Sequence, residues 1–176
     1  MRHPILTALA ALLLALGLSG AANAGPFEDA MAASNRGDHA TALRLWRPLA
    51  DQGHAGAQFH LGAMFANGRG VPQDDVQAVK WFRLAADQGL ASAQFSLGFG
   101  FANGRGVPQD DVQAVKWYRL AADQGDAIAQ FFLGNRYRTG QGVPQDDVQA
   151  MKWYRLAADQ GDADAQFALG LMYAND

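Results

Sequence analysis

The sequence predicts an all-α fold, an α-solenoid built from two-helix repeats with a period of 36 residues. The main observation is that the segment 70–89 returns almost unchanged at 106–125 and again at 142–161. A period of this size is typical of solenoids, whose units stack because none of them can bury its apolar face alone. A second observation is that each copy has a proline near its start and ends at a glycine, residues that typically lie just before and just after a helix.

The repeated segment contains the second helix of each unit. Pro72 lies before this helix, and Asp74 is expected to cap it while Gln77 reaches back as in a capping box. Gly89 supplies the left-handed backbone conformation that ends the helix. We therefore expect second helices over 74–88, 110–124 and 146–160, and we attribute the paired aspartates at each helix start to capping.

The first helix of each unit lies upstream, over 55–66 in the first regular unit. Small or apolar residues recur there at spacings of four, three and four, which places them on one helical face: Ala55, Phe59, Gly62 and Ala66. The glycine of this face is expected to let two helices approach closely. It recurs as Gly62, Gly98, Gly134 and Gly170.

The first 24 residues are expected to be a signal peptide rather than part of the fold. A short basic start precedes the apolar run 5–18, which is too short to span a bilayer. Ala22-Asn23-Ala24 then has the small-x-small pattern of a cleavage site. We expect cleavage after Ala24 and a periplasmic or secreted protein; an uncleaved N-terminal anchor is the alternative.

The rest of the chain divides into a degenerate unit, three regular units and a partial one. Residues 25–51 align with the later units, with Trp46 where Phe82 lies, and are expected to form an N-terminal capping hairpin. The regular units are 52–87, 88–123 and 124–159. Residues 160–176 cover only a first helix, which leaves open whether they cap the array or belong to a longer one.

The composition excludes several classes of function. The chain has no cysteine, so no disulfide can form, and its formal net charge of −3 offers no basic stripe for nucleic acid. There is no second hydrophobic span. We expect a monomer that binds a protein or peptide, without nucleic acid, without cofactor and without stable membrane insertion after cleavage.

The units differ from one another mainly on one face of their first helix. The first two regular units differ at six of their 36 positions, and five of these lie in or beside the first helix. We expect this variable stripe to line the concave side as a groove for a protein or peptide; the alternative is packing against the next unit. Its candidate binding residues are His60, Ala63, Met64, Ser92, Ser96, Phe99, Ile128, Phe132, Asn135 and Arg136.

The fixed residues resemble a known family. Ala-x-Ala-Gln-Phe-x-Leu-Gly occurs at 55–62, 91–98 and 163–170, and leads into Gly-x-Gly-Val-Pro-Gln-Asp and then Ala-x-Lys-Trp-Tyr/Phe-Arg-x-Ala-Ala-Asp-Gln-Gly. These motifs resemble the Sel1-like repeat family, a longer-looped relative of tetratricopeptide repeats. The resemblance implies a right-handed α-solenoid and an adaptor or scaffold role in protein complexes, often in the bacterial envelope.

The resemblance also raises an enzyme alternative, because some cysteine-rich secreted members are described as β-lactam-binding or β-lactam-hydrolysing. The chain has no Ser-x-x-Lys or Gly-x-Ser-x-Gly motif, and Ser92 and Ser96 could be activated only by a distant His60. No pair of histidines has metal-ligand spacing. We therefore expect no catalytic activity and no metal; a third reading is glycan recognition by stacking on Phe99 and Phe132.

Overall fold

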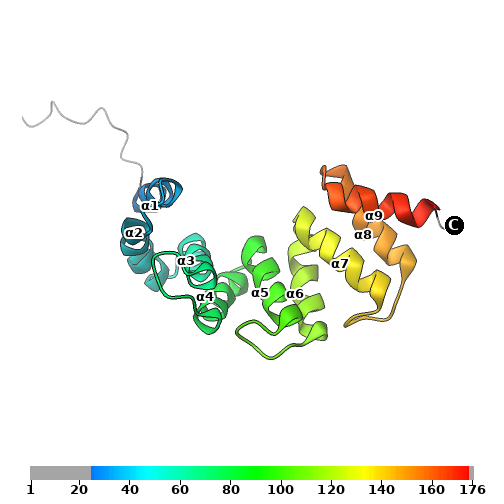
Figure 1. Cartoon of the computed structure of the whole chain (residues 1–176), viewed down its shortest axis with the longest axis horizontal. Helices are drawn as coiled ribbons and strands as arrows, with labels where there is room; N and C mark the ends of the chain where they lie inside the picture. Colours follow the sequence, from blue (N-terminus) through cyan, green and yellow to red (C-terminus); the bar gives the residue numbers. More distant parts are fainter. Residues whose placement is uncertain (1–24, 175–176) are drawn as a thin grey trace, which may run out of the picture.

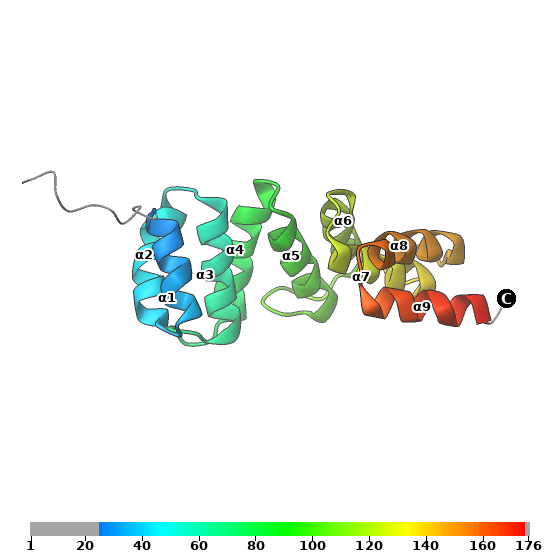
Figure 2. The same cartoon turned by 90° about the horizontal axis from the view of Figure 1, so that it is seen from above.

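The computed structural model describes residues 25–174, which form nine α-helices and no strand. The helices are α1 (Pro26–Asn35), α2 (His39–Asp51), α3 (Ala55–Asn67), α4 (Asp75–Asp87), α5 (Ala91–Asn103), α6 (Asp111–Asp123), α7 (Ala127–Thr139), α8 (Asp147–Asp159) and α9 (Ala163–Ala174). They follow one another along an elongated, curved array, with α1 at one end and α9 at the other (Figures 1 and 2). The signal peptide expected over 1–24 lies outside the described residues.

Successive helices form hairpins that stack on one another. The pairs α1 with α2, α3 with α4, α5 with α6 and α7 with α8 are hairpins, and the second helix of each hairpin packs against the first helix of the next. The helix α9 packs on α8 as the first helix of a further unit. The prediction of an all-α solenoid of two-helix repeats is confirmed.

The residues that were expected to cap the start of a second helix and to terminate it do so. The Asp74 carboxylate accepts a hydrogen bond from the backbone N–H of Gln77 at 2.9 Å, and Gly89 has a φ of +89°. The reciprocal half of the expected capping box is replaced by another contact. The backbone N–H of Asp74 donates to the carbonyl of Phe65 at 2.9 Å, which closes the loop between α3 and α4.

Each regular hairpin is held by an aromatic ring of its second helix that lies on a glycine of its first helix. A Cβ atom added to Gly98 would lie 2.8 Å from the ring of Tyr118, closer than packed carbon atoms approach. The close approach expected at these glycines is therefore confirmed within the three regular units. The pairs are Gly62 with Phe82, Gly98 with Tyr118 and Gly134 with Tyr154.

Buried glutamines connect each unit to the preceding one. The Gln94 side chain donates to the carbonyl of Ala86 on α4, and it accepts a hydrogen bond of 2.7 Å from the side chain of Gln124. This buried amide is therefore satisfied on both sides, as a polar group in a core must be. The same two bonds recur around Gln58 and Gln130.

The N-terminal hairpin, α1 with α2, is tighter than the others. Three residues, 36–38, separate α1 from α2, whereas residues 68–74 separate α3 from α4. Trp46 fills the core position that Phe82 has in the next unit, and Glu28 and Asp29 keep part of the outer face of α1 polar. The outer face of α1 is therefore partly polar, and the capping role expected for residues 25–51 stays a prediction.

Replacing Gly98 by alanine tests the contact between ring and glycine. The added methyl group would collide with Tyr118, so we expect Gly98→Ala to lower the free energy of unfolding by about 1–3 kcal/mol, even though alanine favours a helix by about 1 kcal/mol. Gly170→Ala is the matched control, because a Cβ added at Gly170 meets nothing within 4 Å. Gly170→Ala should unfold at the same urea concentration as the unchanged protein, or at a higher one. An equal loss of unfolding free energy in both variants would contradict the contact between Gly98 and Tyr118.

Replacing Tyr118 by phenylalanine tests a second feature of the same core. The Tyr118 hydroxyl is buried near the Arg136 guanidinium but has no partner in hydrogen-bonding geometry among residues 25–174, so Tyr118→Phe should keep or raise stability at neutral pH, by up to about 1 kcal/mol. Burial raises the pKa of Tyr118 to about 12, whereas an unfolded tyrosine ionises near pH 10. The unfolded chain therefore loses this proton first, and stability falls between about pH 10 and 12.

Tyr118→Phe should remove part of this loss of stability between about pH 10 and 12. Urea unfolding as a function of pH measures the change. Tyr154→Phe is the matched control, because the Tyr154 hydroxyl donates to Asn135 Oδ1 at 2.8 Å and accepts from Arg138 Nε at 3.3 Å. It should lower stability at neutral pH by about 1 kcal/mol. A loss in Tyr118→Phe as large as in Tyr154→Phe would contradict the analysis.

Candidate binding surface

The ten residues of the variable stripe lie on α3, α5 and α7. His60, Ala63 and Met64 come from α3, Ser92, Ser96 and Phe99 from α5, and Ile128, Phe132, Asn135 and Arg136 from α7. Their exposure differs widely: Met64 is 4% exposed and belongs to the core, Ile128 is 51% exposed, and the other eight are partly buried. Their role in binding a partner stays a prediction, but several of them clearly pack between units.

At the N-terminal junction, His60 packs on the capping hairpin. Its ring stacks on the indole of Trp46 with 4.5 Å between centroids and 5° between planes, and Phe27 lies 5.8 Å away. Burial lowers the pKa of His60, because the charged imidazolium would lose its hydration there. His60 is therefore a neutral aromatic packing residue in the fold.

At the junction between α5 and α7, Phe132 packs between rings of the preceding unit. Its centroid lies 5.3 Å from Phe95, 5.6 Å from Tyr118 and 6.3 Å from Phe99. Such tilted and edge-to-face pairs add to the apolar burial of the rings. Phe132 and Phe99 therefore contact each other across two units.

Arg136 forms an ion pair with the preceding unit. Its guanidinium lies 2.9 Å from the carboxylate of Asp111, the first residue of α6, and also donates to Gln141 Oε1. One unit earlier, Asp75 holds the position of Asp111 and pairs with Arg105 at 2.8 Å. The expectation that the paired aspartates serve only as caps is therefore wrong, because the second aspartate binds an arginine of the next unit.

An apolar pocket lies where α4 and α5 meet. Its volume is about 170 Å³. It is lined by Ala66, Asp75, Ala78, Val79, Phe82, Phe95, Ser96, Phe99, Gly100 and Arg105. Two residues of the variable stripe, Ser96 and Phe99, therefore line this α4–α5 pocket, and the pair between Asp75 and Arg105 lies at its edge.

The same position is filled one unit later. Phe132 replaces Ser96, and Arg136 replaces Gly100, so a ring and a guanidinium lie where the α4–α5 pocket has a hydroxyl group and a hydrogen atom. The variable stripe therefore determines how much space is left at each junction.

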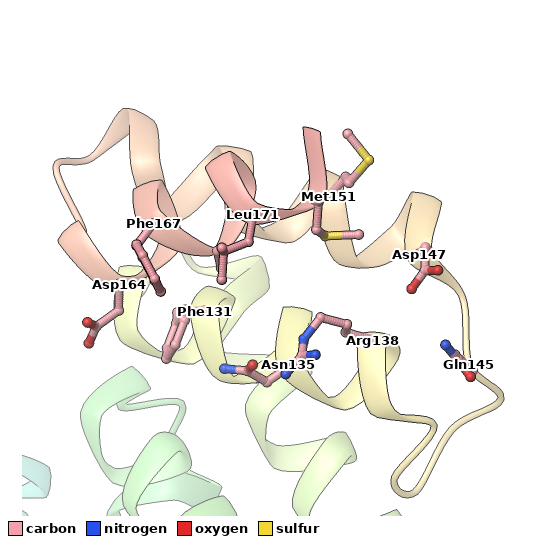
Figure 3. A pocket seen from close by; sticks show the side chains of 11 residues that line it. Phe131, Asn135, Arg138, Gln145, Asp147, Met151, Asp164, Phe167 and Leu171 are labelled. Atoms are coloured by element: carbon pink, nitrogen blue, oxygen red, sulfur yellow. The ribbon is translucent and has the colours of Figure 1, made fainter. Parts of the chain in front are cut away.

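A larger pocket lies among α7, α8 and α9, at the equivalent position two units after the first. Its volume is about 660 Å³, and Ala168 and Met172 take the places of Ser96 and Gly100. It is lined by Phe131, Asn135, Arg138, Gln145, Asp147, Met151, Asp164, Phe167, Ala168, Leu171 and Met172. Figure 3 shows Phe131 and Phe167 at one end of this α7–α9 pocket, Arg138 near its middle, and Gln145 and Asp147 at the other end.

The serines that were considered as nucleophiles lie on α5. The Ser96 hydroxyl donates to the Ser92 carbonyl at 2.8 Å, within its own helix, and His60 stacks on Trp46. The Ser96 hydroxyl is therefore not held by a base among residues 25–174. Among residues 25–174, no group of three or more His, Cys, Asp or Glu side chains could hold a metal ion.

Sequence reasoning missed several residues of the pockets. Phe95 and Phe167 are the equivalents of Phe59, on the face that does not vary, and no role was predicted for Arg105 and Arg138, although all four line a pocket. The sequence did contain one signal, for the ion pair between Asp75 and Arg105. These residues lie 30 positions apart in a repeat of 36, so they belong to neighbouring units and can meet only at the junction between them.

Within the described range 25–174, no helix is both long enough and apolar enough to cross a membrane. A comparison with curated proteins gave no match. The family model of the Sel1 repeat matches residues 35–54, 55–90, 91–126, 127–162 and 163–176.

Solved structures show the same arrangement. A protective antigen of uropathogenic Escherichia coli strains, which displays an SLR fold, shares 40% identity over 85% of this chain and 33% of its own, with a TM-score of 0.82. A Sel1 repeat protein from Oxalobacter formigenes shares 33% identity over 84% of this chain and 60% of its own, with a TM-score of 0.80. The chain thus spans about a third and about three fifths of these two proteins.

Cysteine-rich protein B of Helicobacter pylori is 20% identical over 75% of this chain and 95% of its own, with a TM-score of 0.60, and it shares the fold alone. The family model covers most of the sequence, in register with the helix pairs of the structure. The chain therefore belongs to the Sel1 repeat family, whose members are generally protein-interaction scaffolds.

Proposed function

We propose that this protein is an exported scaffold or adaptor, and that it binds a segment of a partner protein along the variable stripe, on the concave side of the array. The family supports the scaffold role in general. The composition of the variable stripe supports the location of the binding surface, because the stripe combines apolar groups with a few directional polar groups along one row of helices. An interface of this composition suits a protein partner.

The observation that carries this proposal is the change in the inter-unit space along the stripe. Ser96 and Gly100 leave a pocket of about 170 Å³, Phe132 and Arg136 fill the next junction, and α9 leaves a pocket of about 660 Å³. Side chains that served only to stack identical units would fill each junction alike. Different filling produces distinct subsites, which is what recognition of one particular segment requires.

The walls of the two pockets indicate what each would accept. The α4–α5 pocket is walled by Val79, Phe82 and Phe95, so an apolar side chain of the partner fits there. Ile128 is half exposed on α7, on the stripe between the two pockets, and adds an apolar contact. The α7–α9 pocket presents Arg138 with Asp147 beside aromatic rings, and therefore suits a polar or charged group.

The proposal includes export and excludes chemistry by the protein itself. Export is supported by the pattern of residues 1–24, which has a basic start, a short apolar run and a small-x-small site. Because the chain has no cysteine, an oxidising compartment would form no disulfide in it. The Ser96 hydroxyl is held by the carbonyl of Ser92, so no geometry favours hydrolysis of a β-lactam. Binding is the function that these groups support best.

A photo-crosslinking amino acid at position 128 tests the proposed surface in cells that express the protein. Ile128 is 51% exposed on the stripe, and Leu120 is 48% exposed on α6, so the two sites differ in location but hardly in accessibility. We expect a crosslinked partner from position 128 and none from position 120. The same product from both positions, or none from either, would refute a binding surface on the stripe.

Closing the α4–α5 pocket should weaken binding without harming the fold. Ser96→Phe introduces the ring that α7 already carries at the equivalent position, and we expect it to reduce crosslinking from position 128 about tenfold with an unchanged Tm. Ala40→Phe, on an exposed site of α2 away from both pockets, controls for the added aromatic surface. Full crosslinking in Ser96→Phe would show that the pocket is not used.

A further inference from the structure

The α4–α5 pocket has a filled counterpart one unit later, and the counterpart shows what fits such a site. There, the ring of Phe132 lies 5.6 Å from the ring of Tyr118, measured between centroids, with 42° between the planes. The residue at the position of Tyr118 in the α4–α5 pocket is Phe82, which is also aromatic. The ring on the opposite side is missing, because Ser96 stands where Phe132 stands one unit later.

Two further rings belong to the wall on the α5 side. Phe95 and Phe99 both line the pocket, and their centroids lie 6.4 Å apart. One unit later the equivalent of Phe95 is Phe131, which lies edge-on to Phe132 with 87° between the planes. A ring in the pocket would therefore meet Phe82 of α4 and both rings of α5. Edge-to-face and tilted contacts of this kind favour an aromatic ring over an aliphatic group.

The size of the pocket matches one benzene ring. Its volume is about 170 Å³. An apolar protein cavity of about 150 Å³ stays free of water and binds benzene. The pocket also opens to solvent, since Phe95, Ser96 and Phe99 in its wall are only partly buried. A phenyl group on a flexible side chain can therefore enter without unfolding the junction.

The polar groups of the wall are already bound. The Asp75 carboxylate accepts two hydrogen bonds from the Arg105 guanidinium, at 2.8 and 3.2 Å. The Ser96 hydroxyl donates to the carbonyl of Ser92 at 2.8 Å. Since both charged residues of the wall have a partner, a charged ligand would lose hydration in the pocket without gaining an unpaired counter-charge. An uncharged ring pays no such penalty.

We propose that the α4–α5 pocket binds the phenyl ring of a phenylalanine in the partner segment. This inference rests on the proposed function, which places a segment of a partner protein along the variable stripe, and it names the side chain that the segment carries. The partner would supply in trans the ring that Phe132 supplies in cis at the next junction.

Toluene, which is the phenylalanine side chain without its backbone, tests the pocket in the full protein. We expect the methyl resonances of Val79, in the pocket wall, to shift saturably in NMR spectra as toluene is added. Nuclear Overhauser effects should connect toluene to these methyl groups in the unchanged protein, so this readout depends on no variant. Ser96→Phe should abolish the shift because it fills the pocket, and Ala40→Phe should leave the shift unchanged.

Peptides test which side chain the segment carries. Random peptides displayed on phage are selected on the full protein, and those that also bind the Ser96→Phe variant are removed. We expect the remaining peptides to share a phenylalanine. In a synthetic copy, replacing this phenylalanine by alanine should weaken binding at least about tenfold, and replacing it by leucine about threefold, because leucine is apolar but makes no ring contacts.

The outcomes separate this inference from the proposed function. Toluene needs no partner, so its failure to bind would overturn the phenyl pocket, whereas the proposed function is judged by crosslinking from position 128. Toluene binding that persists in Ser96→Phe, selected peptides without a shared phenylalanine, equal affinity of the leucine peptide, or self-association that Ser96→Phe abolishes would each overturn the phenyl pocket as well.

Discussion

The three regular units depend on the contact between a glycine of the first helix and an aromatic ring of the second. A glycine inside a helix costs about 1 kcal/mol, whereas full burial of a large apolar side chain stabilises by about 1.5–3 kcal/mol. The rings of Tyr118 and Tyr154 are fully buried on their glycines, so the gain exceeds the cost. The buried glutamines add polar specificity to the same interface, because Gln94 joins its own second helix to the preceding unit.

Contacts between units preserve a chemical arrangement even where the residues differ. Asp75 binds Arg105, which comes from a loop, whereas Asp111 binds Arg136, which comes from a helix. In the second case Gln141 stands where Arg105 stands one unit earlier, and it accepts a hydrogen bond from Arg136. The carboxylates at the starts of α4 and α6 therefore each obtain a cation from the next unit, by either of two routes.

The sequence predicted the helices well because their ends are determined locally. Pro72, Asp74 and Gly89 act within one turn, so their meaning can be read without knowing the fold. The candidate binding surface was harder to predict, because helical periodicity shows which positions share a face and not how deeply that face is buried. Met64 was expected at the surface and lies in the core, since the loop after α3 and the capping hairpin cover it.

The variable stripe links the stability of the array to the size of the pockets between its units. Phe132 adds ring contacts with the preceding unit and thereby closes the junction, whereas Ser96 and Gly100 leave space and contribute less packing. Opening every junction would remove these inter-unit contacts, and filling every junction would leave no recess for a partner. A solenoid with nearly identical units can therefore acquire a specific surface only if a few positions depart from the repeat, which is the pattern of differences in this sequence.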